Sequence, residues 1–239
     1  MGAKCLQSKS LVDRRIYIYN KKIRNKNIVN GGEEMGKSNV LVDLEKARHL
    51  SILGDTGYGK TRYVRRIVDQ VFEDEPETKV VVFGSRDESW KQLEHMGLIT
   101  LYSMEDTIKG RLLAQEYPHT DNKTLVVVED IWHTLQLLPS KEHNGVVEKL
   151  HELLTRQNVR SIVTSLRPIE VYYPRDILEL ANVKIALRME YDYDYDTFFG
   201  TQAYKEEGKL PEEVGQAFIQ LHATHDPVYI NNSQRVQIK

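Results

Sequence analysis

The sequence has little cysteine and no long apolar run, and each absence excludes a class of protein. Cys5 is the single cysteine of the 239 residues, which excludes an internal disulfide framework and a metal site built on several cysteines. No stretch approaches the roughly 18 consecutive apolar residues of a membrane span, and the N-terminus lacks the apolar segment of a secretory signal. We therefore expect a soluble, cytoplasmic protein without a transmembrane segment.

The charge is unevenly distributed along the chain. The formal net charge is −2, yet residues 1–30 hold eight lysines and arginines and one acidic residue, Asp13. A basic arm on an acidic body often contacts nucleic acid. The other interpretation, a solvated terminus that binds nothing, stays open at this point.

The strongest motif is the segment Gly54–Thr61, which fits the pattern G-x-x-x-x-G-K-T of a phosphate-binding loop. Its glycines let backbone N–H groups surround a polyphosphate, and the N-terminus of a following helix favours the same negative charge. Lys60 is expected to reach the β- and γ-phosphates of ATP, and Thr61 to bind Mg²⁺ through its hydroxyl. The predicted nucleotide-binding residues of this phosphate loop are Gly54, Asp55, Thr56, Gly57, Tyr58, Gly59, Lys60 and Thr61.

Strand-like and helix-like segments alternate around the phosphate loop. This alternation predicts an α/β fold, with a mostly parallel sheet and helices on both faces. The predicted strands are 49–53, 79–84, 98–102, 124–130, 160–164 and 183–189, and the predicted helices are 60–72, 88–96, 104–116 and 146–157.

Shorter segments are predicted to extend this fold at both ends. They are strands at 15–19, 39–44, 228–230 and 236–238, and a strand or loop at 190–196, where acidic and aromatic residues alternate. We divide the chain into a basic N-terminal arm (1–34), a nucleotide-binding core (35–200) and a C-terminal extension (201–239) packed on that core.

The most apolar strand of the sequence ends in two acids, Glu129 and Asp130. A phosphate-loop enzyme needs one carboxylate that holds Mg²⁺ and a neighbouring one that orients or deprotonates the attacking water. We predict these two roles for the pair. The alternative is a plain strand end, because acids often terminate strands.

The strand Ser161–Ser165 is predicted to lie beside the phosphate-loop strand, so that Thr164 or Ser165 places a hydroxyl near the γ-phosphate. Arg156, Arg160 and Arg167 flank this strand. We predict that Arg156, at a helix end, acts in trans in the nucleotide site of a neighbouring subunit, where an arginine stabilises transition-state charge. Surface ion pairs are the alternative for each of these arginines.

Three segments carry a resemblance to a known family. The sequence D-L-x-K-x-x-H-L at 43–50 leads into the phosphate loop, 156–168 ends in Ser165-Leu166-Arg167-Pro168, and 181–188 reads as a last core strand. Together they resemble the FtsK/HerA superfamily of DNA-pumping ATPases over roughly residues 38–200. The resemblance implies a RecA-like core, assembly into a ring that is usually a hexamer, and translocation of double-stranded DNA.

Two positions depart from the pattern of that family. The acids read Glu-Asp instead of Asp-Glu, which gives the Mg²⁺ role to Glu129 and the water-activating role to Asp130. Leu166 replaces the sensor glutamine and cannot hydrogen-bond a phosphate, so we expect the sensor role to shift to Ser165. Both departures motivate an alternative of another class, an ATP-binding scaffold with impaired hydrolysis.

A bare motor of this length resembles the genome-packaging ATPases of membrane-containing double-stranded DNA viruses. We therefore expect a motor that pumps a viral genome into a capsid, located in the host cytoplasm or in the virion and docked on a capsid or membrane portal protein. A plasmid or mobile-element DNA-transfer ATPase is the alternative. The loops that contain Arg86, Lys141 and His143 are predicted to face DNA in the pore of the ring.

Overall fold

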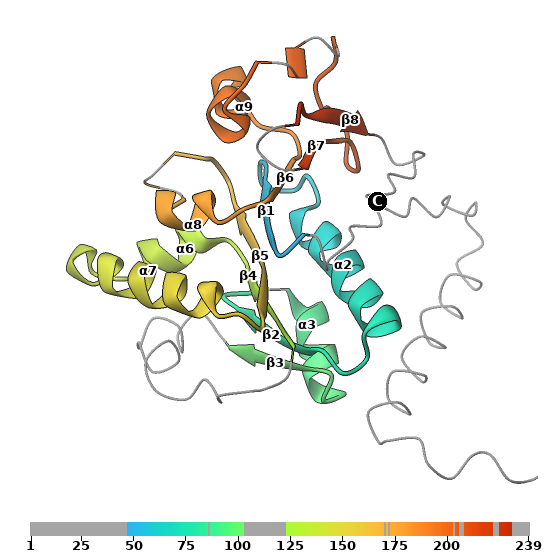
Figure 1. The fold of residues 1–239 in the computed structure, drawn as a ribbon, viewed down its shortest axis with the longest axis vertical. Coiled ribbons are helices and arrows are strands. Elements are labelled where there is room, and N and C mark those ends of the chain that lie inside the picture. The colour runs from blue at the N-terminus through green and yellow to red at the C-terminus, as the bar shows by residue number, and fades with distance from the viewer. Residues whose placement is uncertain are drawn as a thin grey trace, which may run out of the picture.

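A computed structural model describes residues 47–85, 87–102, 123–169, 171, 173–202, 204–205, 208–221 and 225–230. These residues form one eight-stranded sheet in the order β3-β2-β4-β5-β1-β6-β7-β8, with helices on both faces (Figure 1). The strands are β1 (His49–Leu53), β2 (Lys79–Phe83), β3 (Ile99–Tyr102), β4 (Thr124–Val128), β5 (Val159–Ser165), β6 (Val183–Ala186), β7 (Ala217–Leu221) and β8 (Val228–Ile230). The helices are α2 (Lys60–Asp74), α3 (Glu88–His95), α6 (Ile131–Gln136), α7 (Ser140–Thr155), α8 (Arg175–Glu179) and α9 (Asp192–Phe199).

The strands β1 to β6 pair in parallel, whereas β7 and β8 join the sheet as antiparallel strands. Parallel strands place their carboxyl ends at one edge of the sheet, which is where ligands bind in open α/β folds. β5 lies between the phosphate-loop strand β1 and the acid-bearing strand β4. The loops after β1, β4 and β5 therefore meet at this edge.

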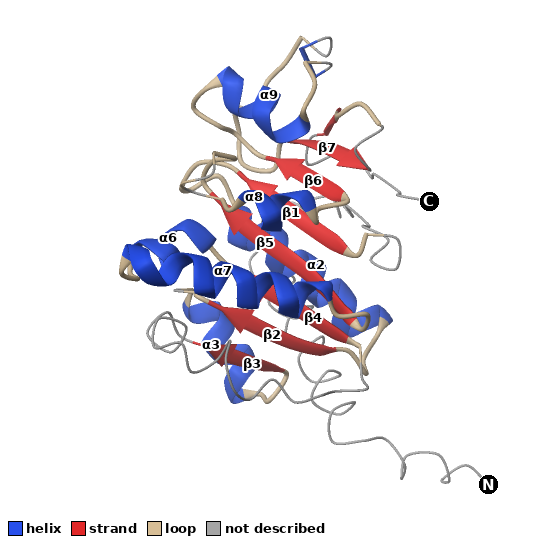
Figure 2. Cartoon of the chain, turned by 60° about the vertical axis from the view of Figure 1, so that its left-hand side comes forward, coloured by secondary structure: helices blue, strands red, loops and turns tan. Residues whose placement is uncertain are grey.

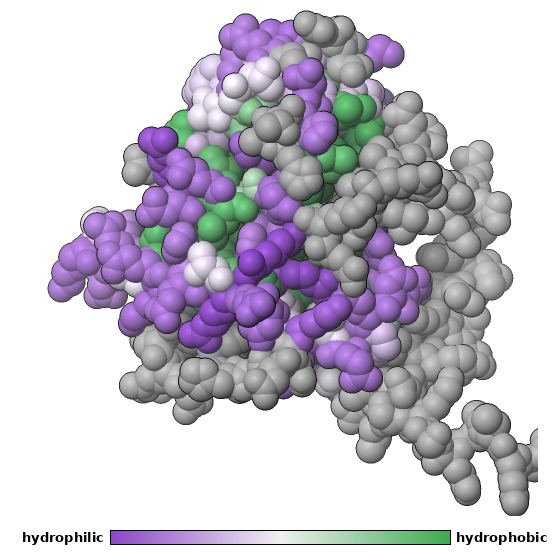
Figure 3. All heavy atoms as spheres, viewed as in Figure 1, coloured by the Kyte–Doolittle hydropathy of each residue, from purple (hydrophilic) through white to green (hydrophobic). Residues whose placement is uncertain are grey.

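Two hydrophobic clusters fill the space between the sheet and its helices. The cluster on one face contains the apolar side chains of α2 and α3, and the cluster on the other contains those of α6, α7, α8 and α9. Figure 2 shows α6 and α7 in front of the sheet and α2 behind it. On the face seen in Figure 1, hydrophilic residues cover the outer side of α7 (Figure 3).

Most of the predicted elements are confirmed. The six predicted core strands match β1 to β6, 228–230 matches β8, and the helices predicted at 60–72 and 88–96 match α2 and α3. The helix predicted at 146–157 begins six residues earlier, at Ser140. The sequence patterns missed α6, α8 and β7, and the predicted elements at 15–19, 39–44, 104–116 and 236–238 lie outside the described residues.

The prediction of a strand or loop at 190–196 is wrong, because the segment enters the helix α9. Its alternating tyrosines and acids suggest a strand, but Tyr195, Phe198 and Phe199 have helical spacing and are buried against the core. Asp192 and Asp194 lie in the first turn, where negatively charged carboxylates interact favourably with the helix dipole. Gly200 ends the helix in the left-handed conformation, with a φ of 70°.

Asp194 in α9 is a fully buried acid that Arg167 neutralises. The Arg167 guanidinium donates to both carboxylate oxygens, with Nε–Oδ2 and Nη2–Oδ1 distances of 2.8 and 3.1 Å. Arg167 also stacks on Tyr191 and Tyr193. The hydrogen bonds to Asp194 hold the pKa of the Arg167 guanidinium above its usual range. Arg167 therefore forms an ion pair, as the alternative interpretation expected. Its partner Asp194 is buried, however, and does not lie on the surface.

Replacing this arginine gives the first prediction. Because Arg167→Ala leaves the Asp194 carboxylate buried and unpaired, it should lower the free energy of unfolding by about 3–5 kcal/mol. Chemical denaturation of both proteins measures this. Arg175→Ala is the control, because it breaks an exposed pair with Glu179 and should cost less than about 1 kcal/mol. Equal losses in the two variants would contradict the account.

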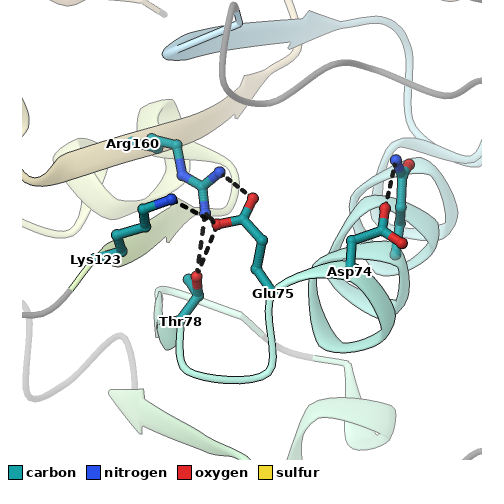
Figure 4. A network of polar contacts seen from close by, with 6 residues as sticks. Asp74, Glu75, Thr78, Lys123 and Arg160 are labelled. Carbon is teal, nitrogen blue, oxygen red and sulfur yellow. Dashed lines mark hydrogen bonds and ion pairs between the residues drawn. The ribbon is translucent and has the colours of Figure 1, made fainter.

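A second, partly buried ion pair lies at the opposite edge of the sheet, where the amino ends of the parallel strands are. Arg160 at the start of β5 donates to both oxygens of Glu75, at 2.6 and 3.0 Å, and to Thr78 Oγ1 at 3.3 Å. Figure 4 shows this guanidinium facing the Glu75 carboxylate, with Lys123 Nζ 3.6 Å from the same acid. Although burial acts to raise it, the Arg160 bonds and charge hold the pKa of Glu75 below its usual value. Arg160 therefore anchors the turn after α2 and lies away from the phosphate loop.

Among the described residues, no helix is long and apolar enough to cross a membrane.

Candidate functional site

The phosphate loop connects β1 to α2 and has the backbone that its glycines predict. Gly57 and Gly59 have φ values of 88° and 94°, and α2 begins directly after Gly59. Gly54 is required by a close approach, because a Cβ there would lie 2.8 Å from Leu187 Cβ and 3.0 Å from Arg188 O. Asp55 N–H donates to the same Arg188 carbonyl at 2.8 Å. The segment after β6 thus supports the loop from outside.

Lys60 points back over the loop. Its Nζ donates to the carbonyls of Gly54 and Asp55 at 2.6 and 3.2 Å. Burial lowers the pKa of this ammonium, whereas the charges of Asp130, Asp55 and Glu129 act to raise it. Lys60 is thus a partly desolvated cation with acids nearby, held where a phosphate oxygen would compete for its hydrogen bonds.

Glu129 follows β4 and is almost completely buried, with 6% of its surface exposed. Its Oε2 accepts a hydrogen bond from Trp90 Nε1 at 3.1 Å, whereas Oε1 makes no hydrogen bond to the described part of the chain. Burial raises the pKa of this carboxyl, and the nearby Ser85 and Thr61 hydroxyls and the Trp90 indole act to lower it. A buried, unpaired carboxylate oxygen beside the Thr61 hydroxyl fits Mg²⁺, which prefers oxygen ligands and one or two carboxylates.

Asp130 adopts a strained conformation next to Glu129. It is the non-glycine residue with a positive φ (51°) among the described residues, and such strain concentrates at functional sites. Its N–H donates to Thr164 Oγ1 at 2.8 Å, and its buried Oδ1 has no hydrogen-bond partner among those residues. This hydrogen bond ties the end of β4 to the end of β5.

These groups surround one cavity of about 370 Å³. Two loops predicted from separate parts of the sequence therefore meet around it, as expected. Gly84, Asp87 and His133 also line the cavity but belong to no motif of the sequence. His133 could have been found from its position one helical turn after Asp130. The lining residues are Thr56, Gly57, Gly59, Lys60, Thr61, Gly84, Asp87, Glu129, Asp130, His133 and Thr164.

The structure corrects the choice of Ser165 over Thr164. Successive side chains of a strand point to opposite faces, and Thr164 pairs with Ile52 whereas Ser165 pairs with Leu53. Ile52 packs on the α2 face and Leu53 on the other, so Thr164 points toward the phosphate-loop side. Ser165 is fully buried and does not line the cavity. Thr164 replaces it as the candidate sensor.

Arg156 lies at the other edge of the sheet. It follows α7 and precedes the first residue of β5. The seven residues of β5 span roughly 20 Å, and the cavity lies at the far, carboxyl end of this strand. Its side chain lies 3.7 Å from Glu152. Arg156 therefore cannot reach the nucleotide site of its own chain, and its action in trans stays a prediction.

The predicted pore loop with Lys141 and His143 is wrong as a loop. Both residues lie in the first turns of α7, and His143 Nε2 is 2.9 Å from the Leu138 carbonyl. Ser140 begins the helix after Pro139, whose fixed φ suits a helix start. Contact of these residues with DNA stays a prediction, and Arg86 lies outside the described residues.

His49 in the lead-in segment is a buried structural residue with a predicted pH effect. Its Nδ1 lies 2.9 Å from Ser161 Oγ, and burial, with a contribution from the Arg48 charge, lowers the pKa of His49 to about 4. Between pH 6.5 and 4 the unfolded chain binds a proton that the folded chain does not, so stability falls as the pH falls through this window.

We expect this effect to remove about 2 kcal/mol of the free energy of unfolding between pH 7 and pH 5. Denaturation at both pH values measures it, and His49→Gln is the control for all other titrating groups. The variant should lose less stability than the wild type over this range. Parallel pH profiles would show that His49 is not the cause.

The sequence matches the family "Helicase HerA, central domain" over residues 29–161, which is more than half of the chain. No curated protein sequence matches it significantly. The pCW3 conjugation coupling protein TcpA, solved with ATPγS, has a similar structure, with a TM-score of 0.59 and 15% identity over 80% of this chain and 61% of TcpA.

Two further solved structures have the same fold. The cytoplasmic domain of the Thermomonospora curvata type VII secretion ATPase EccC gives a TM-score of 0.56 and 16% identity over 77% of this chain, which spans 25% of that domain. The genome packaging NTPase B204 of Sulfolobus turreted icosahedral virus 2, with AMPPCP, gives 0.55 and 10% identity over 80% of this chain and 99% of B204. The chain belongs to the HerA helicase central-domain family of P-loop ATPases.

Proposed function

We propose that the chain is an ATP-driven translocase of double-stranded DNA that packages a viral genome into a capsid. The observation that carries the ATPase part is the cavity itself, where Lys60 and Thr61 face Glu129, Asp130 and Thr164. Family membership supports the link to a nucleic-acid motor. The match to B204 over nearly all of its length supports the choice of packaging.

In this proposal each side of the cavity has its own role. The phosphate-loop N–H groups and Lys60 hold the β- and γ-phosphates, and Thr61 and Glu129 supply oxygen ligands for Mg²⁺. When bound, Mg²⁺ neutralises charge on the phosphates. Asp130 orients the attacking water and accepts its proton, and Thr164 links the state of this acid to β5.

Among the described residues, the cavity is lined by one lysine against three acids, and a further cation from a neighbouring subunit would stabilise the transition state. We propose that the chain forms a ring, a hexamer by family resemblance, in which Arg156 of one subunit enters the site of the next. We further propose that 1–34 is a basic arm for DNA, 35–200 the motor core and 201–239 an extension. A capsid or portal protein in the host cytoplasm or virion would be the docking partner.

The test is ATP turnover with and without duplex DNA, on the wild type and on Lys60→Ala. The proposal expects DNA to raise the wild-type rate severalfold and to leave the Lys60→Ala background unchanged. ATP binding by the wild type without turnover above that background would instead favour the ATP-binding scaffold, which the Glu129-Asp130 order and Leu166 motivate.

A DNA-transfer ATPase is the second candidate, because the conjugation coupling protein TcpA shares the fold. Co-purification separates the two functions. Binding to a capsid component favours packaging, whereas binding to a relaxase favours transfer.

A further inference from the structure

His133 is a polar residue of the cavity for which the proposed function above has no role. It lies in α6, which begins directly after Asp130, and a spacing of three residues returns its side chain to the same side of the helix. The imidazole lines the cavity together with Asp130 and Lys60. Its Nε2 is buried and makes no hydrogen bond to any residue that the structure describes.

An unsatisfied nitrogen of this kind is costly in a folded protein. A buried polar group without a partner costs on the order of 1–3 kcal/mol. Asp130 Oδ1, one helical turn away, is also buried and unpaired among the described residues, and the two atoms do not bond each other. Glu129 Oε1 is the third such atom at this cavity. The residues that carry these three atoms all line the cavity together with Lys60, which is the arrangement expected if a ligand satisfies them.

The chemistry of the wall identifies what His133 would bind. Glu129, Asp130 and Asp87 carry carboxylates, which accept hydrogen bonds when ionised and cannot donate to a phosphate oxygen. Thr164 accepts the Asp130 N–H and keeps its own O–H as a donor on the β5 side of the cavity, and Leu166 offers no polar atom. With its proton on Nε2, His133 is a donor on the side of the cavity formed by β4 and α6.

We propose that His133 is a further catalytic residue, which donates a hydrogen bond from Nε2 to a γ-phosphate oxygen of ATP. This inference rests on the proposed ATPase function and adds a residue that distinguishes ATP from ADP. It places a donor on the γ-phosphate opposite Lys60, so that the phosphate is held from both sides while Asp130 acts on the water. Loss of the γ-phosphate removes the partner of His133, which makes α6 a second element that senses hydrolysis, beside Thr164 in β5.

Nucleotide affinity tests this directly. The dissociation constants of ATPγS and ADP are measured with Mg²⁺ by calorimetry for the wild type, His133→Leu and His133→Gln. We expect His133→Leu to weaken ATPγS binding about tenfold while ADP binding changes less than about twofold, because only ATPγS carries the γ-thiophosphate. His133→Gln, which keeps an amide donor, should retain most of the preference.

Two controls make each outcome decisive. His95→Leu changes an exposed histidine at the end of α3 and should alter neither constant. Thermal unfolding of each variant confirms that it folds. If His133→Leu does not fold, His133→Gln is compared with His133→Asn instead, because the shorter asparagine amide should not reach the γ-phosphate oxygen. Equal weakening of ATPγS and ADP, or no change in either, would overturn the proposal. This test needs no DNA, whereas DNA-stimulated turnover tests the translocase proposal. Failure of one proposal can therefore be distinguished from failure of the other.

Discussion

Lys60→Ala should weaken the binding of MgATP by about a hundredfold or more and reduce ATP turnover to background. Lys60 supplies the ammonium that lines the cavity, and charge-assisted hydrogen bonds contribute about 1.5–3 kcal/mol each, so the loss of two amounts to a hundredfold or more. Its removal also leaves the carboxylates of Asp87, Glu129 and Asp130 facing a polyphosphate without an opposing charge from the other described residues that line the cavity. Repulsion between these charges adds to the loss.

Titration with a fluorescent ATP analogue and a phosphate-release assay measure both effects. Lys79→Ala is the matched control, because Lys79 is exposed at the start of β2, at the other edge of the sheet. That variant should behave like the wild type. Tight MgATP binding by Lys60→Ala would show that the cavity is not the nucleotide site.

Asp130→Asn should lower kcat about a hundredfold or more while changing the affinity for ATPγS only a few-fold. A positioned general base contributes roughly 10²–10⁴ to a rate, and the amide of asparagine cannot accept the proton of the attacking water. Asparagine tolerates the left-handed conformation that Asp130 adopts, so the backbone hydrogen bond to Thr164 should persist. The change therefore removes the charge without displacing α6.

Comparison with Glu129→Gln separates the roles of the two acids. Because Glu129 is the proposed Mg²⁺ ligand, this second variant should raise the Mg²⁺ concentration needed for half-maximal turnover, whereas Asp130→Asn should not. Single-turnover kinetics over a series of Mg²⁺ concentrations give both quantities. The opposite result, with the Mg²⁺ effect in Asp130→Asn, would assign the metal role to Asp130 and contradict the account.

The parts of the site that local patterns encode could be predicted from the sequence. The phosphate loop lies between a strand and a helix, and Glu129 and Asp130 end an apolar strand, so each is recognisable within about ten residues of chain. Their meeting at one cavity also follows, because parallel strands place these ends at the same edge of the sheet.

The remaining features depend on contacts between distant segments. Whether Thr164 or Ser165 faces the cavity depends on which side of the sheet α2 covers, and the Trp90 bond to Glu129 joins residues 39 positions apart. The alternating tyrosines and acids of α9 suggest a strand. The segment is nevertheless helical, because Tyr195 and Phe198 pack on the core and Arg167 neutralises Asp194. Tertiary burial outweighed local periodicity at each of these sites.

Displacement of a DNA triplex tests the central claim most directly, since only movement along the duplex strips a third strand. The account predicts that the wild-type protein displaces the strand at a rate that increases with ATP concentration. It also predicts that ATPγS and the Lys60→Ala variant give no displacement. ATP turnover that is independent of DNA, with the triplex left intact, would contradict the account.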